Sequence, residues 1–476
     1  MLPYTDLQIR TNMKLYGNDI FSDKIFYHIY PLGMGNCPKE NNFTQSAGNF
    51  FEILETDLDR IRRLGCNAIY LGPVFESTRH GYDTLDYYHV DRRLGNNESF
   101  KKFCDTAHEM GFAIVLDAVF NHTGRDFFAF KDLIAKGQDS QYRDWYQGLN
   151  FSSRSNYGDS FDYDGWAGCK DLVKLNLRNR DVRNHILGAV SFWMDFFKID
   201  GLRLDAADVM DKDFFEELGK FCRERKNDFW LMGEVVHGDY NEWCNPKRID
   251  SVTNYQLYKA IFSSVDSRNF FELSYNLNRE SGNDGGMYRY APLYNFLDNH
   301  DINRVASEIQ NPEKELYMIY GLLFSIPGIP SIYYGSEFAL KGTRTQYGDQ
   351  DLRPSIPPFT DFPEHLKQPF DVSFLSNAIS VFSEIRKNSP SLQKGSYREF
   401  HVENQIFAFE RIYEENEINE RIVIICSTKS DPCSLNLDFI PEGTYTELIS
   451  GTEHSLYGLK NFKLNPFDIV LLKAAR

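Results

Sequence analysis

Eight short apolar segments alternate with amphipathic helical stretches in the first two-thirds of the sequence, and this alternation limits the folds open to the chain. Each segment is continuous and rich in Ile, Val, Leu and Tyr, as strands buried on both faces are. The segments are 25–30, 68–71, 113–119, 201–205, 230–234, 251–254, 293–297 and 331–334. Eight strands alternating with helices predict an α/β fold, a (β/α)8 TIM barrel whose helices form the outer ring.

The stretches between these segments carry apolar residues at helical spacing. In the first of them Gly65 follows the apolar stripe as a helix stop signal. That stripe consists of Phe51, Leu54, Leu58, Ile61 and Leu64. Similar stripes lie in 100–110, 182–197 and 214–221. We interpret the aromatic residues in these stripes as core side chains rather than ligand platforms.

Two parts of the sequence depart from the alternation. Residues 122–173 are rich in Gly, Ser, Asp, Tyr and Trp and are too long for an ordinary connection, which predicts an inserted subdomain after the third strand. From residue 391 the apolar pattern has period two, which predicts a C-terminal antiparallel β domain, 391–476. The barrel is therefore expected in two parts, 1–121 and 174–390.

Charge and composition exclude several classes of partner. The 476 residues include 52 Lys and Arg against 68 Asp and Glu, a net charge of −16 that repels nucleic acid and anionic membranes. Residues 316–336 carry no charge, but Pro327 and Pro330 would break a spanning helix, so we predict a buried helix, a turn and a buried strand. We expect neither nucleic-acid nor membrane partners.

The cysteines and the N-terminal segment bear on the expected location. The eight cysteines are scattered without a CxxC pair, a pattern typical of free thiols in a reducing compartment. The segment MLPYTDLQIR has neither a basic region nor an apolar region of the kind found in export signals. Together these features predict a cytoplasmic protein.

Acidic residues stand at the ends of four predicted strands. The segments DAVFNH (117–122), GLRLDAAD (201–208), GEV (233–235) and FLDNHD (296–301) carry Asp117, Asp205, Glu234 and Asp301. Taken singly, an Asp at a strand end is usually a helix cap or an ion-pair partner. Barrel strands, however, bring their carboxyl ends to one rim. Three carboxylates there suit glycosidic bond cleavage, which needs an attacking carboxylate, a proton donor and a group that holds the sugar.

These four segments resemble the four short motifs of the α-amylase family, glycoside hydrolase family 13. Three further segments resemble that family in the same order along the chain, and the likeness covers about residues 20–390. They are HGYDTLDYYHVDRRLG (80–95), LVKLNLRNRDVR (172–183) and IPGIPSIYYGSE (326–337). The C-terminal β domain also fits the family.

The resemblance implies a role for each acidic residue and for one arginine. Asp205 would be the nucleophile, and Arg203 would keep it ionised because a nearby cation lowers a carboxyl pKa. Asp117 would brace Arg203 from behind. Glu234 would be the general acid and then the general base. Asp301 would bind the 2- and 3-hydroxyls of the distorted sugar.

The resemblance also implies a set of residues that bind the substrate. Tyr82 would offer its ring as a stacking platform for the sugar at the cleavage point. Asp83, beside it, would meet a hydroxyl on the non-reducing side. His122 and His300 would donate hydrogen bonds to neighbouring hydroxyls.

Departures from the family pattern concern the leaving-group side and calcium. Asp208 and Val209 stand where large endo-acting amylases carry Lys-His. Lys174 stands where calcium-dependent amylases have an Asp ligand, although Asn121 matches a calcium ligand of many relatives. The loop 31–43 lacks a calcium-binding pattern. We therefore expect no cofactor and no required metal ion.

The segments VKLN and GYDT favour the neopullulanase, cyclomaltodextrinase and maltogenic amylase group. Two features differ from that group: about 22 residues precede the first strand, too few for its N-terminal β domain, and Val236 and His237 stand where Trp is usual. The prediction is an enzyme, a monomer or homodimer, that hydrolyses α-glucosidic bonds of maltooligosaccharides with retention.

Two alternatives stay open at this point. An exo-acting α-glucosidase or an α-glucan transglycosylase would carry the same residues at the cleavage point. A non-catalytic binding protein built on an amylase-like barrel is the other alternative. Such proteins typically lose a catalytic carboxylate, whereas this sequence keeps Asp205, Glu234 and Asp301.

Overall fold

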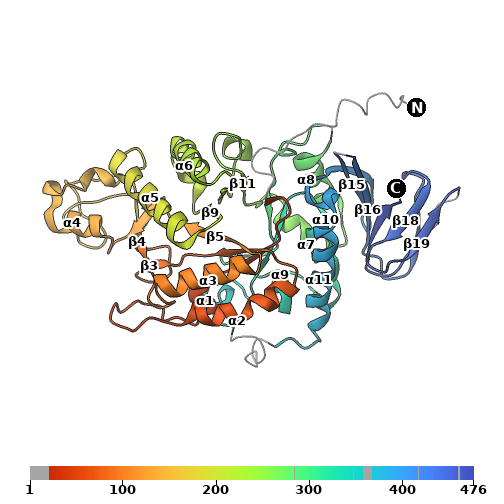
Figure 1. Cartoon of the computed structure of the whole chain (residues 1–476), viewed down its shortest axis with the longest axis horizontal. Coiled ribbons are helices and arrows are strands. Elements are labelled where there is room, and N and C mark those ends of the chain that lie inside the picture. The colour runs from red at the N-terminus through yellow and green to blue at the C-terminus, as the bar shows by residue number, and fades with distance from the viewer. Residues whose placement is uncertain are drawn as a thin grey trace.

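The chain folds into a barrel with an inserted segment at one end and a β-sheet unit at the other (Figure 1). This computed structural model describes residues 21–283, 285–346, 348–356, 367–415, 417–458 and 461–475. The segment MLPYTDLQIR, on which the export prediction rests, lies outside the described residues. Among the helices of the described residues, none combines the length and apolar character needed to cross a bilayer.

Eight parallel strands form the barrel, and they confirm the eight segments predicted from the sequence. The strands pair in the order β11-β10-β9-β5-β2-β1-β13-β12. A further parallel bridge between Thr253 and Tyr294 joins the two ends of this sheet and closes it. The strands are β1 (Phe26–Ile29), β2 (Ala68–Leu71), β5 (Ala113–Ala118), β9 (Gly201–Leu204), β10 (Trp230–Gly233), β11 (Ser251–Val252), β12 (Tyr294–Asn295) and β13 (Ile329–Tyr333).

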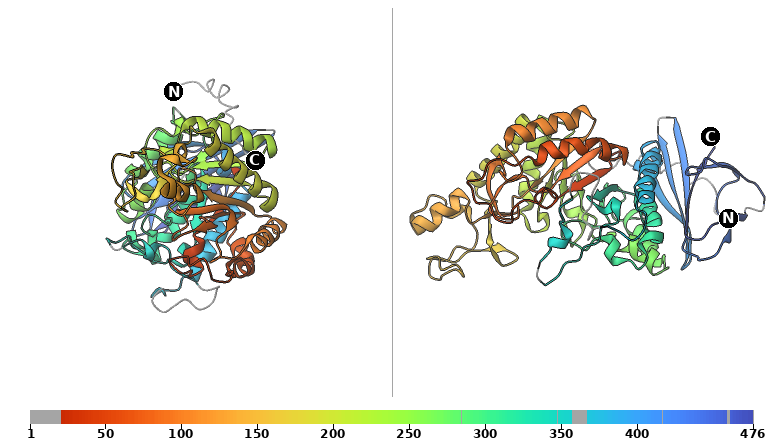
Figure 2. Two further views of the ribbon diagram at one scale, coloured as in Figure 1. Left: turned by 90° about the vertical axis from the view of Figure 1, so that its left-hand side faces the viewer. Right: turned by 90° about the horizontal axis from the view of Figure 1, so that it is seen from below.

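Helices between the strands cover the outside of the barrel (Figure 2). The apolar side chains predicted over 182–197 are buried along the whole stretch, but the helix type changes within it. The α-helix α5 ends at Phe192, and a π-helical turn follows over Trp193–Phe197. The helices are α1 (Pro31–Met34), α2 (Phe50–Arg63), α3 (Asn97–Glu109), α5 (Arg180–Phe192), α6 (Lys212–Arg225), α7 (Tyr258–Asp266), α8 (Phe271–Ser281), α9 (Val305–Glu308), α10 (Pro312–Ser325), α11 (Ser373–Lys387) and α12 (Pro390–Lys394).

The insertion after the third strand contains a helix and a small sheet. It comprises β6 (His122–Gly124), α4 (Phe128–Lys136), β7 (Gly165–Trp166) and β8 (Cys169–Lys174), with strand order β6-β8-β7. A hairpin of β3 (Phe75–Ser77) and β4 (Thr84–Val90) follows the second barrel strand and contacts this insertion. The inserted subdomain is therefore present, while its division from the barrel at residues 121 and 173 stays a prediction.

A six-stranded antiparallel sheet follows the barrel, with order β14-β15-β16-β21-β18-β19, and a two-stranded sheet β17-β20 lies with it. Residues of alternate parity along its strands face opposite sides: Phe407 and Ile424 join the barrel's core, whereas Val423 belongs to a second apolar cluster. The boundary at 390 stays a prediction. The strands are β14 (Ser396–Val402), β15 (Ile406–Glu415), β16 (Ile418–Ser427), β17 (Cys433–Asn436), β18 (Gly443–Glu447), β19 (Glu453–Leu456), β20 (Asn461–Leu464) and β21 (Asp468–Ala474).

The charge-free run 316–336 is a buried helix, a turn and a buried strand, as predicted. The helix α10 ends at Ser325, the proline-containing turn follows, and β13 begins at Ile329. Both elements are buried along most of their length. Burial between the barrel and the C-terminal sheet therefore explains the absence of charge in this run.

Candidate active site

One buried arginine contacts three carboxylates at the carboxyl ends of three neighbouring strands. Arg203 on β9 donates from Nη1 to Asp117 Oδ1 at 2.8 Å and to Asp205 Oδ1 at 2.9 Å. Its Nη2 lies 2.8 Å from Glu234 Oε1. Parallel pairing places β5, β9 and β10 side by side, so residues far apart in the sequence meet around a single guanidinium.

A tight turn after β9 shapes the space between two of these carboxylates. Ala206 has a left-handed backbone with φ of 48°, which is uncommon for a residue other than glycine. In this conformation its N–H donates to Glu234 Oε2 at 3.0 Å. His122 Nε2 lies 4.0 Å from Asp205 Oδ2 and has no hydrogen-bond partner among the described residues. The turn therefore orients Glu234, and His122 separately keeps a ring nitrogen without a hydrogen-bond partner near Asp205.

Burial and mutual repulsion set the protonation of the two central carboxyls. Burial raises the pKa of Glu234, the carboxylate of Asp301 adds to the rise, and Arg203 opposes it. Burial also raises the pKa of Asp205; Arg203 opposes this rise and Glu234 adds to it. Two buried carboxyls that repel one another when both are ionised favour a state in which the pair holds one proton. The site can therefore present one carboxylate and one carboxylic acid together.

Asp301 is held as an anion by two neighbours. Its Oδ2 lies 3.0 Å from His300 Nε2, and its Oδ1 lies 3.2 Å from Arg353 Nη2. Burial alone would raise the pKa of Asp301, but attraction and hydrogen bonding from His300, followed by attraction from Arg353, lower it below its usual range. The side chain is still 34% exposed, so a ligand can reach it.

Tyr82 and His300 form a stacked pair beside the carboxylates. Their ring centroids lie 5.5 Å apart with an interplanar angle of 10°, and the Tyr82 hydroxyl shares a hydrogen bond with His300 Nε2. The same hydroxyl donates to Asp117 Oδ2 at 3.0 Å. Tyr30 stacks on His300 at 5.8 Å. Aromatic stacking and hydrogen bonds thus hold the Tyr82 ring in one orientation.

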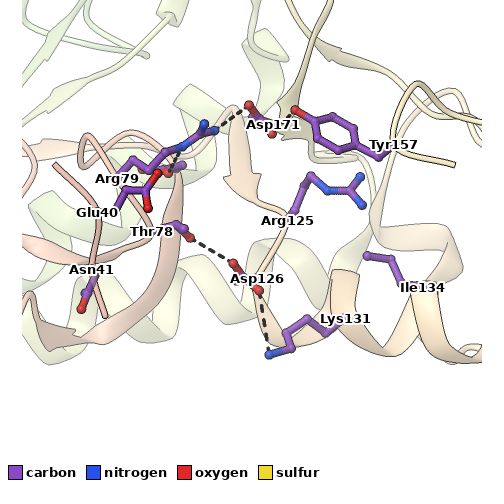
Figure 3. Close-up of a pocket in the computed structure, with 11 residues that line it drawn as sticks. Glu40, Asn41, Thr78, Arg79, Arg125, Asp126, Lys131, Ile134, Tyr157 and Asp171 are labelled. Carbon is purple, nitrogen blue, oxygen red and sulfur yellow. Dashed lines mark hydrogen bonds and ion pairs between the residues drawn. The ribbon is translucent and has the colours of Figure 1, made fainter. Parts of the chain in front are cut away.

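Asp83 lies apart from this group. Its Oδ1 accepts the backbone N–H of His80 at 3.0 Å, and its Oδ2 lies 3.6 Å from Arg79 Nε. The residue lines a cavity between the β3–β4 hairpin and the insertion (Figure 3). The structure therefore brings together Asp117, Asp205, Glu234, Asp301, Tyr82, His122, Arg203 and His300, but it directs Asp83 elsewhere.

Besides Tyr30, four residues in the site were missed by the sequence analysis. Tyr70 donates its hydroxyl to Asp117 Oδ2 at 2.8 Å. Asn299 donates to the Tyr255 hydroxyl at 2.9 Å and accepts the N–H of Asp301 at 2.8 Å. Asn299 stands inside the segment FLDNHD, so its position gave a usable signal. Arg353 lies in an irregular segment beyond every motif, and nothing in the local sequence marks it.

The residues that depart from the family pattern can also be placed in the structure. Asp208 accepts the N–H of Val236 at 3.4 Å, and Val209 is exposed. Lys174 pairs with His122 across β6 and β8. Within the part of the chain that the structure describes, no group of three or more His, Cys, Asp or Glu side chains is arranged to hold a metal ion. The absence of a required calcium ion stays a prediction.

Comparisons with known proteins agree with this geometry. The family description "Alpha amylase, catalytic domain" matches residues 40–369. A cyclomaltodextrinase of Bacillus sp. is 32% identical over 345 residues, which is 67% of this chain and 60% of that protein. An intracellular maltogenic amylase of Bacillus subtilis (strain 168) is 31% identical over 308 residues, 64% of this chain and 51% of that protein. The chain thus matches between half and two-thirds of the length of these two relatives.

A solved structure has the same architecture over nearly the whole chain. It is the cyclic alpha-maltosyl-(1→6)-maltose hydrolase of Arthrobacter globiformis, with a TM-score of 0.77 and 25% identity. The match covers 97% of this chain and 100% of that one. The family match alone spans more than half of the sequence. The chain therefore belongs to the α-amylase family of glycoside hydrolases, glycoside hydrolase family 13.

Proposed function

We propose that this protein hydrolyses α-glucosidic bonds in maltooligosaccharides and related α-glucans with retention of configuration. One observation carries the proposal: the guanidinium of Arg203 contacts Asp205 at 2.9 Å and Glu234 at 2.8 Å. A shared cation keeps the two carboxyls close together. This closeness supports the separation of about 5–5.5 Å that retaining glycosidases use, rather than the roughly 6.5–9.5 Å of inverting ones.

The reaction has two steps. Asp205 attacks the anomeric carbon while Glu234 transfers its proton to the leaving glycosidic oxygen, and a covalent glycosyl-enzyme forms. Glu234, now a carboxylate, then takes a proton from water as the water oxygen attacks the same carbon and Asp205 leaves. Two inversions restore the α configuration. In the first step the one proton that the pair holds sits on Glu234, whose carboxyl is oriented by the N–H of Ala206 and by Arg203.

The remaining residues bind the sugar at the cleavage point. Asp301, held as an anion, would accept hydrogen bonds from the 2- and 3-hydroxyls. His300 and His122 would donate to neighbouring hydroxyls, and the Tyr82 ring would stack against the sugar. Asp117 accepts two hydrogen bonds from Arg203, at 2.8 and 3.0 Å, and so braces the guanidinium that contacts Asp205.

The relatives favour short or cyclic α-glucans as substrates, since their names include cyclomaltodextrinase and a hydrolase of cyclic maltosyl-maltose. We further propose a cytoplasmic location, supported by the intracellular relative, and a monomer or homodimer. Calcium is proposed to be dispensable, because the ammonium group of Lys174 does not suit a cation site.

Replacement of the nucleophile tests the mechanism. Asp205→Asn should lower the release of reducing ends from maltoheptaose by at least about 1,000-fold, because the attacking carboxylate is lost. Asp213→Asn, at an exposed position on α6, is the matched control and should keep most of the activity. Circular dichroism checks that both variants fold.

Turnover of Asp205→Asn close to that of the parent enzyme would contradict the proposed nucleophile. Product analysis with maltotriose and pullulan then separates the alternatives. Glucose as the sole product would point to an exo-acting α-glucosidase. Products longer than the substrate would point to a transglycosylase.

A further inference from the structure

A cavity of about 550 Å³ lies between the β3–β4 hairpin and the inserted subdomain. Figure 3 shows Arg79 and Thr78 on the hairpin side, and Arg125, Tyr157 and Ile134 on the side of the insertion. A volume of this size falls within the range of small-molecule sites. Apart from Asp83, its lining includes none of the residues to which we assign a part in cleavage.

The charged side chains in this cavity largely neutralise one another. Arg79 Nη2 lies 2.5 Å from Asp171 Oδ2, and Lys131 Nζ lies 3.9 Å from Asp126 Oδ1. Arg125 pairs at 2.8 Å with Asp159. Paired charges offer alternating donors and acceptors without a strong net field. This lining suits a neutral ligand with many hydroxyl groups better than a free anion or cation.

Tyr157 provides an accessible aromatic ring at the cavity. The guanidinium of Arg125 lies 4.2 Å from its ring centroid, and its hydroxyl donates to Asp171 at 2.5 Å. These contacts hold the ring, yet the residue remains 53% exposed. A held ring with accessible surface can stack against the apolar face of a pyranose.

Asp83 supplies an independent indication of a ligand. The residue is 2% exposed, and its Oδ2 lies 3.6 Å from Arg79 Nε but accepts no hydrogen bond from any described residue. A buried acceptor without a donor costs free energy. A sugar hydroxyl in the cavity would supply the missing donor.

We propose that this cavity is a second glucan-binding site, separate from the cleavage point, that holds a pyranose unit through Tyr157 and Asp83. The inference rests on the proposed function, because it takes the same substrate class. It also gives Asp83 a sugar contact at a different place from the one that the sequence suggested. The site adjoins the turn that carries Tyr82, since Asp83 accepts the N–H of His80 in that turn.

Binding stoichiometry tests the second site. Equilibrium dialysis with labelled maltose uses Asp205→Asn as the background, so that no cleavage occurs. This variant should bind two maltose molecules. Adding Tyr157→Ala should weaken one of the two sites by about threefold to tenfold or more, the effect of losing one aromatic contact. Adding Tyr157→Phe, which keeps the ring, should leave both sites intact.

Two further variants complete the experiment. Tyr275→Ala removes an exposed tyrosine on α8, away from the cavity, and should change neither site. Ile134→Trp should fill part of the cavity and weaken the same site as Tyr157→Ala, which covers the case in which Tyr157→Ala does not fold. One bound maltose in the Asp205→Asn background would overturn the second site. No bound maltose at all would instead contradict the proposed function.

Discussion

Among single residues, Arg353 contacts the segment that carries Asp301 and so bears directly on the proposed chemistry. It contacts Asp301 at 3.2 Å and donates from Nε to the carbonyl of His300 at 3.0 Å. Removing its charge should raise the pKa of Asp301, because one of the cations that lower it is lost. Asp301 nevertheless stays ionised at working pH, because its pKa starts well below its usual range. In Arg353→Ala the kcat/KM for maltotriose should therefore fall by about tenfold at every pH, because Asp301 loses one of the two contacts that hold its side chain.

Arg353→Lys is the matched control, since it keeps a positive charge near Asp301 and should retain more of the activity. The acid and alkaline limbs of the pH profile, which we assign to Asp205 and Glu234, should stay close to their original positions in both variants. Activity of Arg353→Ala equal to that of the parent enzyme would contradict a role of Arg353 in holding Asp301.

For single residues, the sequence was enough to predict which side chains at the ends of the barrel strands belong to the site. Asp205, Glu234 and Asp301 could be found because barrel strands bring such positions to one rim. Arg353 could not, since its contact with Asp301 depends on the path of an irregular segment. Asp83 was assigned to the substrate next to Tyr82, but both residues lie in an irregular turn before β4, and there Asp83 faces Arg79 instead.

Between elements, a buried carboxyl joins helix α8 to the end of β11. Glu280 is 1% exposed, and its Oε2 accepts from Asn254 Nδ2 at 2.9 Å. Burial raises the pKa of Glu280 to about 7. Its contribution to stability is complete below the unfolded pKa of about 4.3 and is lost as the pH rises through about 7, at a cost of about 4 kcal/mol.

Glu280→Gln removes this dependence on pH. The variant should match the parent protein in unfolding temperature near pH 5 and exceed it near pH 8, as measured by calorimetry. Glu272→Gln, on the same helix but not among the buried residues, is the control and should follow the parent protein at both values. Parallel stability curves for Glu280→Gln and the parent protein would rule out ionisation of Glu280 as the cause.

At the level of elements, continuous apolar runs were enough to predict every barrel strand. The π-helical turn over Trp193–Phe197 was not predictable, because the apolar stripe is the same for either helix type. In the C-terminal part, the period-two pattern was enough to predict an antiparallel β domain but not the number of its strands. The short strands β17, β19 and β20 have few buried residues and so give a weak apolar pattern.

Across the whole molecule, a buried arginine, Arg411, attaches the C-terminal sheet to the barrel, and Arg386 of the barrel binds the same helix end. Arg411 on β15 donates to the carbonyl oxygen of Ser325 at 2.9 Å, and Arg386 on α11 donates to that of Phe324 at 3.0 Å. Both carbonyls belong to the last turn of α10, where a helix favours positive charge. The joint between the two parts is therefore polar as well as apolar.

Arg411→Ala should lower the free energy of unfolding by about 2–4 kcal/mol, because it leaves a cavity and buried carbonyls without a donor. Calorimetry should show a single transition at lower temperature, since residues of both parts share one core. Lys463→Ala, an exposed position on β20, is the control and should leave the transition unchanged. Two resolved transitions would mean that the barrel and the sheet unfold independently.

The shared core also constrains how such a protein can be rebuilt. Phe407, Phe409 and Ile424 from the sheet lie in the same apolar cluster as the side chains of the barrel helices. A shortened enzyme that ends after α12 would expose that surface to water and would be prone to aggregate. Transfer of this catalytic unit to another protein therefore has to include both the barrel and the C-terminal sheet.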